Sequence, residues 1–487
     1  MNILVIDVGT SSMRGILFSH DGNELVEHQK TYKATYMKNG WVEQSPSDWE
    51  NALYEIMTNI STVAVEKRWT IDGVTITSQR SSVIPVDSEI HPLCNAIMWQ
   101  DKRTTDICEV LSDQNDKVFS LCGSRVNPVF SASKMTWVRN NCPDLYEKIY
   151  KFMVIPDYLI YLLTGKLCTD YTYGSRSLLM NVYSCQWDDE LLDLFQVKRE
   201  HLLDLIEPGS ICGYLTKQIQ ERTGCPAGIP VVTAGGDQQC GAIGQGIIKE
   251  GKMSVTAGTG GFLITAVDHI PKNIKQDVII GMSSVKNQYM LEANILTCCS
   301  AFDWFRKEFY ENISLNEINK ILEETPVGAN ACMCVPYFQG RSTPDWNDRA
   351  RGVFANISLG TSKADMMRSL LEGICFEIKN GIENMEKYLD ISEIYVNGGL
   401  TNSDIFNKIQ CSVYGKRIIR RGKTDATARG ALMIAATILG MYTEIETAFA
   451  KIMSQNEEKI YYPEMESVLF YEQARERMNG FYTKIKE

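Results

Sequence analysis

The amino-acid sequence predicts an α/β protein built from two related domains. Its length of 487 residues exceeds what a single hydrophobic core usually supports, so two large domains are expected. Apolar runs rich in β-forming residues alternate with helical patterns along the chain, which is typical of the α/β class. A strand–turn–strand pattern with a Gly/Thr turn occurs at the start and returns about half a chain later. We therefore expect each domain to begin with such a hairpin.

The first half begins with a hairpin and continues with alternating strands and helices. ILVID (3–7) reads as a buried strand, VGTSSM as a turn and RGILFS (14–19) as a second strand. GVTITSQ (73–79) predicts a further strand, and SKMTWVRNN (133–141) and PDYLIYLLTG (156–165) predict helices. This alternation favours an α/β domain.

The second half repeats the pattern. KMSVTAGTGGFLITAV (252–267) again reads as strand, Gly/Thr turn and strand. The domain boundary is therefore expected near 246–251, which separates an N-terminal domain (1–246) from a C-terminal domain (247–487). Further elements are expected as a strand over 393–399, helices over 403–415 and 425–440, and a terminal helix over 465–487.

The composition excludes several classes of partner. The chain carries a net charge of -11, whereas proteins that bind nucleic acid or anionic membranes use basic patches, so neither partner is expected. Fifteen Cys without paired spacing near the five His indicate free thiols in a reducing cytosol rather than a zinc site. The start MNILVIDVGTSS lacks a basic n-region, and no apolar run approaches the roughly 20 residues of a membrane span. We expect a soluble cytoplasmic protein.

Asp7 and Arg14 flank a loop that can bind phosphate. Gly9 lets a phosphate approach the backbone. Hydroxyl donors are added by Thr10, Ser11 and Ser12. Asp7 can hold Mg²⁺ directly or through water, and Arg14 can neutralise a transferring phosphoryl group. The alternative is an ordinary hairpin turn, in which Asp, Gly, Thr and Ser are all common.

A second loop of the same kind contains Thr259 and Gly260. Two such loops at equivalent places in two domains can face each other across a cleft and hold one phosphate chain. Gly398 and Gly399 follow a predicted strand, and their bare backbone suits a flat ring such as adenine. An ordinary helix-entry turn is the alternative for this pair, and local evidence favours it.

Asp237 lies within VVTAGGDQQCGAIGQG (231–246), directly after an apolar run and a Gly pair. It can be a turn residue, a metal ligand or the base of a reaction. Attack by an alcohol on a γ-phosphate requires removal of the hydroxyl proton, which a nearby carboxylate can accept. Gln238 can hold a second hydroxyl. GGDQQCGAIG also fits an Asp N-cap followed by a short helix, and locally this interpretation is favoured.

Three further side chains can contact a small polyol. Trp99 and Phe262 can stack on it, and Arg80, after a predicted strand, can donate to its hydroxyls. Tryptophan is more often a core residue, and a solvated surface is the commoner place for arginine.

Taken together, these stretches resemble the FGGY family of carbohydrate kinases, which includes glycerol kinase, xylulokinase and ribulokinase. The similarity runs in order along nearly the full length. DVGTSSMR resembles the family's first phosphate loop, GGDQQ the segment with the catalytic Asp, and AGTGGF the second phosphate loop. Other similar stretches are WVEQSPSDW (41–49), MWQDKR (98–103), IPDYLIYLLTGKLCTDYTYGSRSLL (155–179), PYFQGRSTPDWNDRARGVF (336–354), VNGGLTNSDIF (396–406) and DATARGALMIAA (425–436).

The resemblance implies two actin-like, ribonuclease-H-like domains that close on a cleft, where ATP with Mg²⁺ meets a small sugar or polyol. The implied activity is in-line phosphorylation of a hydroxyl, with Asp237 as general base. Asp7 and Asp237 are then expected at the magnesium ion. The residues implied for the substrate are Arg80, Ser81, Trp99, Asp237, Gln238 and Phe262. Those implied for the nucleotide are Thr10, Ser11, Ser12, Arg14, Thr259, Gly260, Gly398, Gly399 and Ser403.

The substrate is indicated by departures from the family's patterns. Glycerol kinases carry Arg-Glu where this chain has Arg80-Ser81, and Pro-Tyr-Phe-Ser where it has Pro-Val-Phe-Ser at 128–131. GDQQ itself resembles glycerol kinase, and the Met-His pair typical of xylulokinase is absent at 80–81. Loss of two hydroxyl-binding side chains leaves more space. A larger polyol or a sugar, such as the pentulose xylulose, is therefore favoured, with glycerol as the alternative.

Two other classes of function stay open. One is a non-catalytic ATP-binding switch on the same actin-like scaffold, because fold alone does not fix function. The other is an acyl-transfer or phosphatase enzyme, although the chain has no G-x-S-x-G motif and its five His form no evident triad. The sequence also leaves open whether the chain acts alone or as a homodimer.

Overall fold

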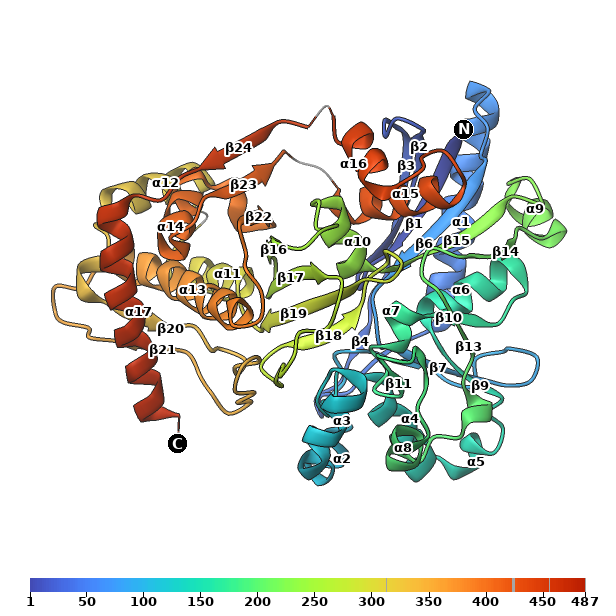
Figure 1. The fold of residues 1–487 in the computed structure, drawn as a ribbon, viewed down its shortest axis with the longest axis horizontal. Helices are drawn as coiled ribbons and strands as arrows, with labels where there is room; N and C mark the ends of the chain where they lie inside the picture. Colours follow the sequence, from blue (N-terminus) through green and yellow to red (C-terminus); the bar gives the residue numbers. More distant parts are fainter. Residues whose placement is uncertain (312, 423–424, 455, 487) are drawn as a thin grey trace. The chain divides into compact units, whose positions relative to one another are not determined.

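The chain divides into two compact units, each assembled from three stretches of sequence. The computed structural model describes residues 1–487 apart from 312, 423, 424, 455 and 487. Unit 1 consists of Met1–Ile248, Ile280–Met290 and Thr424–Gln455. Unit 2 consists of Lys249–Ile279, Leu291–Lys423 and Asn456–Glu487. Each unit therefore depends on segments that lie far apart in the sequence (Figure 1).

Unit 1 is built on a mixed sheet. Its strands are β1 (Asn2–Val8), β2 (Ser12–Ser19), β3 (Glu24–Thr31), β6 (Gly73–Ser78), β14 (Ile211–Tyr214) and β15 (Pro230–Gly236). They follow the order β14–β15–β6–β1–β2–β3. The β1–β2 and β2–β3 pairs are antiparallel, whereas β1–β6 and β6–β15 are parallel. Almost all of β1 and β6 is buried. Strand β1 accordingly reads as a nearly continuous apolar run, whereas β6 alternates apolar residues with buried threonines.

A second sheet carries the strands that follow the middle of the chain. They are β16 (Lys252–Ala257), β17 (Gly261–Val267), β18 (Ile279–Met282), β19 (Tyr289–Ile295), β22 (Glu393–Asn397), β23 (Ile418–Arg421) and β24 (Glu458–Tyr461). Their order is β18–β19–β17–β16–β22–β23–β24. The β16–β17 pair is antiparallel, and β16–β22 and β22–β23 are parallel.

The two sheets share one topology. In both, an N-terminal hairpin supplies adjacent central strands, a third strand follows on the hairpin side, and two parallel strands follow on the other side. The corresponding strands are β1 and β16, β2 and β17, β3 and β19, β6 and β22, and β15 and β23. The hairpin repeat predicted from the sequence is therefore confirmed.

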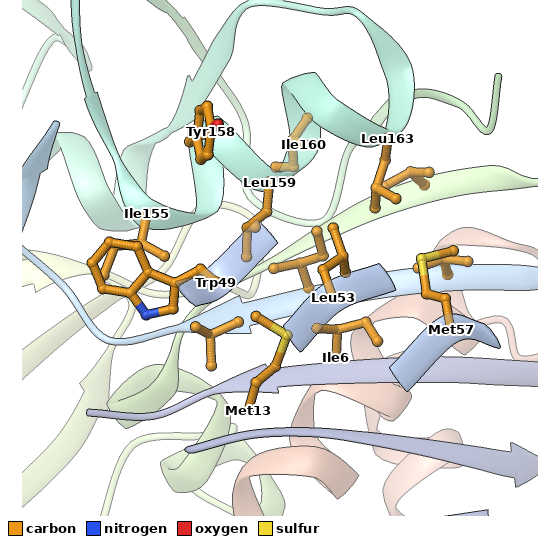
Figure 2. Close-up of a cluster of buried hydrophobic side chains, with 14 of the residues drawn as sticks. Ile6, Met13, Trp49, Leu53, Met57, Ile155, Tyr158, Leu159, Ile160 and Leu163 are labelled. Atoms are coloured by element: carbon orange, nitrogen blue, oxygen red, sulfur yellow. The ribbon is translucent and has the colours of Figure 1, made fainter. Parts of the chain in front are cut away.

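A hydrophobic cluster of unit 1 anchors its first hairpin. Helix α1 (Pro46–Lys67) presents Trp49, Leu53 and Met57 at four-residue spacing, so all three lie on one face. Figure 2 shows these side chains near Ile6 of β1 and near helix α6 (Ile155–Thr164). Trp49 is fully buried. This packing holds β1 and β2 at the base of the loop that joins them.

Most of the remaining helices also lie in unit 1. They are α2 (Thr105–Val110), α3 (Asn115–Cys122), α4 (Ser131–Asn141), α5 (Pro143–Tyr146), α7 (Tyr171–Gly174), α8 (Asp189–Phe195), α9 (Lys217–Thr223), α10 (Asp237–Gly244), α15 (Ala426–Ile438) and α16 (Ile445–Ile452). Short strands accompany them, namely β4 (Thr35–Tyr36), β5 (Val42–Gln44), β7 (Val83–Val86), β8 (Ala96–Ile97), β9 (Lys151–Val154), β10 (Cys168–Asp170), β11 (Met180–Asn181), β12 (Gln186–Trp187) and β13 (Asp204–Ile206).

Unit 2 has longer helices. They are α11 (Cys299–Phe309), α12 (Leu315–Glu324), α13 (Lys363–Glu386), α14 (Asp404–Tyr414) and α17 (Met465–Ile485), with a small ribbon of β20 (Met333–Val335) and β21 (Val353–Ala355). The helices predicted near 403–415, 425–440 and 465–487 are thus confirmed as α14, α15 and α17. Within the described part of the chain, no helix has the length and apolar character needed to span a membrane.

Candidate active site

The β1–β2 loop of unit 1 brings Asp7 and Arg14 together. The two residues are direct partners in the antiparallel ladder. Nη2 of Arg14 donates a hydrogen bond to Oδ2 of Asp7 at 2.8 Å. Between them, the carbonyl of Gly9 accepts hydrogen bonds from the Tyr32 hydroxyl at 2.7 Å and from Nε2 of Gln79 at 3.1 Å. The loop is therefore held in shape by three independent contacts.

A residue absent from the predicted set, Asp425, also contacts Arg14. Its carboxylate forms an ion pair with the same Nη2 atom. Asp425 is the N-cap of α15, and its Oδ1 accepts a hydrogen bond from the backbone N–H of Ala428 at 3.1 Å. The signal was visible in the stretch DATARGALMIAA, where Asp425 precedes an apolar helix, but sequence distance gives no hint of its contact with Arg14.

Burial raises the pKa of Asp7 to about 6. The negative charges of Asp425 and, less strongly, Asp237 add to this rise, and Arg14 opposes it. Among the described residues, no three His, Cys, Asp or Glu side chains form a metal-binding group. Two carboxylates suffice for Mg²⁺, which keeps several waters and takes other ligands from substrate phosphates. The carboxylates of Asp7 and Asp237 are side chains of the type that can hold such an ion.

Asp237 lies at the junction of β15 and α10. The locally favoured interpretation, that Asp237 is the helix N-cap, is wrong, because Gly236 is the N-cap and Asp237 is the first helical residue. Asp237 and Gln238 are half-buried, whereas Gln239 is completely buried. Asp237 and Gln238 therefore remain accessible at the end of an otherwise buried strand.

Arg80 lies against the glycine that precedes Asp237. A Cβ added at Gly236 would lie 2.7 Å from Cδ of Arg80, so only glycine allows this approach. Nη1 of Arg80 donates a hydrogen bond to Oε1 of Gln239 at 3.2 Å. The structure thus brings Arg80 to the start of α10.

Trp99 reaches the β1–β2 loop of unit 1. Its Nε1 donates to Oγ1 of Thr10 at 3.4 Å, and its backbone N–H donates to Oγ of Ser82 at 3.1 Å. Ser81 is buried, with a positive φ of 71°. Its hydroxyl donates to the carbonyl of Arg176 at 3.2 Å. The hydroxyl of Ser81 therefore donates its proton to the protein's own backbone.

The segment around Val129 is held by a buried lysine. Lys134 of α4 is fully buried, and its Nζ donates to the carbonyls of Pro128 at 2.7 Å and of Val129 and Phe130 at 3.0 Å. Burial lowers the pKa of Lys134 to about 7. The sequence drew attention to Val129 because it lacks the hydroxyl of the tyrosine found there in glycerol kinases. It did not predict that Lys134 hydrogen-bonds the backbone at this position.

In unit 2, the two predicted nucleotide loops lie in contact. Gly398 has a φ of 99°, and a Cβ there would lie 2.2 Å from the carbonyl oxygen of Ala257. Glycine is therefore required for the Gly398–Gly399 turn to approach the β16–β17 loop. Thr259 is exposed, while its carbonyl accepts from the backbone N–H of Cys298 at 2.9 Å.

Cys299 links the same two loops and was not predicted. Its backbone N–H donates to Gly258 O at 2.8 Å, and its Sγ donates to Ala257 O at 3.0 Å. A Cβ placed at Gly399 would lie 3.8 Å from this sulfur. The residue is the first of α11, and nothing in the spacing of the fifteen Cys distinguishes it.

Two further predicted residues of unit 2, Ser403 and Phe262, have different surroundings. Ser403 is the N-cap of α14, where its Oγ accepts from the N–H of Phe406 at 3.1 Å and donates to Oδ1 of Asn319 at 2.6 Å. Phe262 is half-buried on β17, opposite Thr256. The hydroxyl of Ser403 thus caps the N-terminus of α14.

A separate cavity of about 320 Å³ opens in unit 2 between α13, α17 and residues 341–345. None of the predicted site residues lines it. Its arginines are neutralised from within, because Arg475 pairs with Glu383 at 2.7 Å and Arg341 with Glu377 at 2.7 Å. Both arginines that line the cavity are therefore paired with carboxylates of the protein itself.

Comparisons with known proteins agree over the whole chain. The model of the N-terminal domain of the FGGY family of carbohydrate kinases matches residues 2–244, and that of its C-terminal domain matches residues 253–439. A glycerol kinase of Thermococcus onnurineus is 32% identical over 453 residues, covering 91% of this chain and 90% of the relative. A xylulose kinase of Bacillus subtilis is 26% identical over 487 residues, covering 100% and 97%.

The fold also matches solved structures. A ligand-bound xylulose kinase from Lactobacillus acidophilus superposes with a TM-score of 0.93 at 22% identity, covering 99% of this chain and 98% of that one. The predicted fold class, two actin-like, ribonuclease-H-like domains, is thereby confirmed. Because the two family models together cover most of the sequence, the chain belongs to the FGGY family of carbohydrate kinases.

Proposed function

We propose that this carbohydrate kinase transfers the γ-phosphoryl group of ATP in line to a hydroxyl of a small sugar, with Asp237 as general base. The observation that carries the proposal is the position of Asp237. It is half-buried at the start of α10, close enough to Asp7 to raise the pKa of that residue, and it follows a glycine against which Arg80 packs. A carboxylate so placed can accept the hydroxyl proton as the new P–O bond forms.

The remaining polar residues divide into two sets. In unit 1, Arg80, Ser81, Trp99 and Gln238 would bind the sugar, and Thr10, Ser11, Ser12 and Arg14 the phosphates. In unit 2, Thr259 and Gly260 would bind phosphate oxygens, Gly398, Gly399 and Ser403 the adenosine, and Phe262 the substrate. Residues 1–246 would thus contribute the sugar-binding domain and 247–487 the nucleotide-binding domain.

Asp7 and Asp237 are the residues that would hold Mg²⁺. Carboxylate oxygens suit this ion, and its charge would offset that of the phosphates. Arg14 supplies a further positive charge beside Asp7, at 2.8 Å. The chain itself thus supplies the base, an arginine and hydroxyl donors, all on or near the edge where β1 and β15 end.

A pentulose such as xylulose is the favoured substrate, and glycerol is the alternative. Ser81 offers no carboxylate and directs its hydroxyl proton to a backbone carbonyl, and Val129 offers no hydroxyl at all. Both features leave fewer polar contacts for a three-carbon triol. The 32% identity to a protein named glycerol kinase keeps the alternative in place.

The role of Asp237 is tested by Asp237→Asn. We expect kcat to fall by at least about 100-fold, because base catalysis typically contributes 10²–10⁴-fold, while the thermal unfolding temperature stays close to that of the parent. The matched control is Asp189→Asn, since Asp189 is also the first residue of a helix, α8, but is exposed. Near-normal turnover by a folded Asp237→Asn protein would contradict the assignment.

The substrate is tested by an ADP-release assay with glycerol, erythritol, xylulose, ribulose, fuculose, rhamnulose and gluconate. We expect the highest kcat/KM with a pentulose. A clear preference for glycerol would overturn the pentulose proposal and leave the kinase mechanism intact. ATP consumption that rises with none of these compounds would contradict the proposed function itself.

A further inference from the structure

We propose that Asp425 is a positioning residue of the transfer reaction, which fixes the guanidinium of Arg14 beside the phosphate loop. The inference rests on the proposed role of Arg14 toward the phosphates. One terminal nitrogen of Arg14, Nη2, forms ion pairs with both Asp7 and Asp425. Asp7 belongs to the adjacent strand of the same hairpin, whereas Asp425 comes from a segment more than 400 residues away in sequence.

This ion pair is better defined than an ordinary surface pair. The side chains of Arg14, Asp7 and Asp425 retain 29%, 12% and 15% of their exposure to solvent. Exposed pairs gain little because water screens them and both side chains move freely. Here, solvent is mostly excluded, and the carboxylate of Asp425 is also fixed by its hydrogen bond to the N–H of Ala428.

The helix that carries Asp425 is itself firmly positioned against the helix of Asp237. A Cβ added at Gly430 of α15 would lie 1.9 Å from the carbonyl oxygen of Cys240 in α10. A Cβ added at Gly244 of α10 would lie 1.9 Å from the carbonyl oxygen of Ala426, next to Asp425. The backbones therefore touch directly, and α15 sets Arg14 at a constant position relative to the proposed base.

The use of a single nitrogen matters for the chemistry. A guanidinium has five N–H donors, so Arg14 can present its others to phosphate oxygens while both acids hold Nη2. Asp425 also competes with phosphate for the charge of Arg14. Its removal should therefore leave ATP binding as tight or tighter, but should lower kcat, because a less constrained guanidinium stabilises the transferring group less well.

The test uses Asp425→Ser, since serine is a good N-cap and only the charge is lost. We expect kcat to fall about tenfold or more, as small misplacements of catalytic groups can cost up to about 100-fold. The dissociation constant for ATP, measured by calorimetry without sugar, should be unchanged or lower. The unfolding temperature should stay near that of the parent.

A double-mutant cycle with Arg14→Gln distinguishes an effect of Asp425 that acts through Arg14 from a general effect on the fold. The effects of Asp425→Ser on kcat and on ATP affinity should disappear in the Arg14→Gln background, because the residue acts through Arg14. Equal effects in both backgrounds, or a kcat that Asp425→Ser does not change, would overturn the inference. Turnover that rises with no sugar would contradict the proposed function, whereas sugar-dependent turnover that Asp425→Ser leaves unchanged would overturn the role of Asp425 alone.

Discussion

At the scale of single residues, the site concentrates negative charge around Asp7. Burial and the nearby carboxylate of Asp425 raise the pKa of Asp7 to about 6. In the folded protein, Asp7 thus keeps its proton at a pH where the unfolded chain has lost it. For this group, the folded state binds more protons between about pH 4 and 6, so its contribution to stability falls as the pH rises through that window.

Asp7→Asn should reveal this effect in the ligand-free protein. Asparagine resembles the protonated carboxyl, so variant and parent should unfold at similar temperatures near pH 4. Above pH 6, the variant should be more stable by up to about 3 kcal/mol, since each pKa unit corresponds to about 1.4 kcal/mol. Thermal unfolding at pH 4, 5, 6 and 7.5 measures the difference.

Asp21 provides a control of opposite sign. Its pKa is lowered, chiefly by the hydrogen bond from the Ser19 hydroxyl, and the residue is partly exposed in the turn between β2 and β3. Asp21→Asn should therefore be slightly less stable than the parent by an amount that stays constant above about pH 4 and shrinks only as the pH falls below 4, because a lowered pKa contributes its full stability above the unfolded pKa. A difference between Asp7→Asn and its parent that stays constant with pH would contradict the raised pKa.

At the scale of elements, the crossing of α10 and α15 depends on glycine. The carbonyl of Cys240 occupies the place where a Cβ at Gly430 would lie. Backbone cannot move aside as a flexible side chain can, so a methyl group there forces the helices apart. The close crossing is what connects the helix of the proposed base with the N-cap that holds Arg14.

Gly430→Ala should therefore destabilise the protein by about 1–3 kcal/mol or more, which is typical of overpacking. It should also lower kcat, because α15 carries Asp425. The matched control is Gly480→Ala in α17, where a Cβ would meet no atom within 4 Å. That change should be neutral or stabilising by up to about 1 kcal/mol, as is usual for glycine to alanine in a helix. Comparable unfolding temperatures for both variants would contradict the packing argument.

At the scale of the whole molecule, unit 1 cannot be isolated by cutting the chain at one point. Helix α15 comes from the C-terminal third of the sequence, yet it packs against β1, β6, β15 and α10. Most of its side chains are buried, including Leu432, Met433 and Ile434. A fragment that lacks this helix would expose the apolar surface that it covers.

A protein consisting of residues 1–246 should consequently lack a rigid tertiary structure. We expect far-UV circular dichroism typical of α/β proteins, weak near-UV signals and strong binding of the dye ANS, which are the signs of lost side-chain packing. The full-length chain serves as the control and should show a cooperative thermal transition. A fragment that unfolds as cooperatively as the full chain, without binding ANS, would contradict this prediction.

The sequence predicted much of the fold because its signals are local. Alternation, turn chemistry and buried apolar runs act over a few residues, so both hairpins and helices α14, α15 and α17 could be placed near their observed bounds. The same locality produced an error at Asp237. Its residue type suits an N-cap, but the bend after β15 places Gly236 at that position.

Residue type and motif order were sufficient to predict the hairpin loops, the acid that follows β15 and membership of a kinase family. Each of these depends on short stretches of neighbouring residues. Tertiary structure alone decided three contacts: Asp425 with Arg14, Cys299 with Gly258, and Lys134 with the backbone around Val129. Such contacts follow from how helices and loops pack. The periodicity of apolar residues does not predict that α15, from the last quarter of the chain, packs against the first strand.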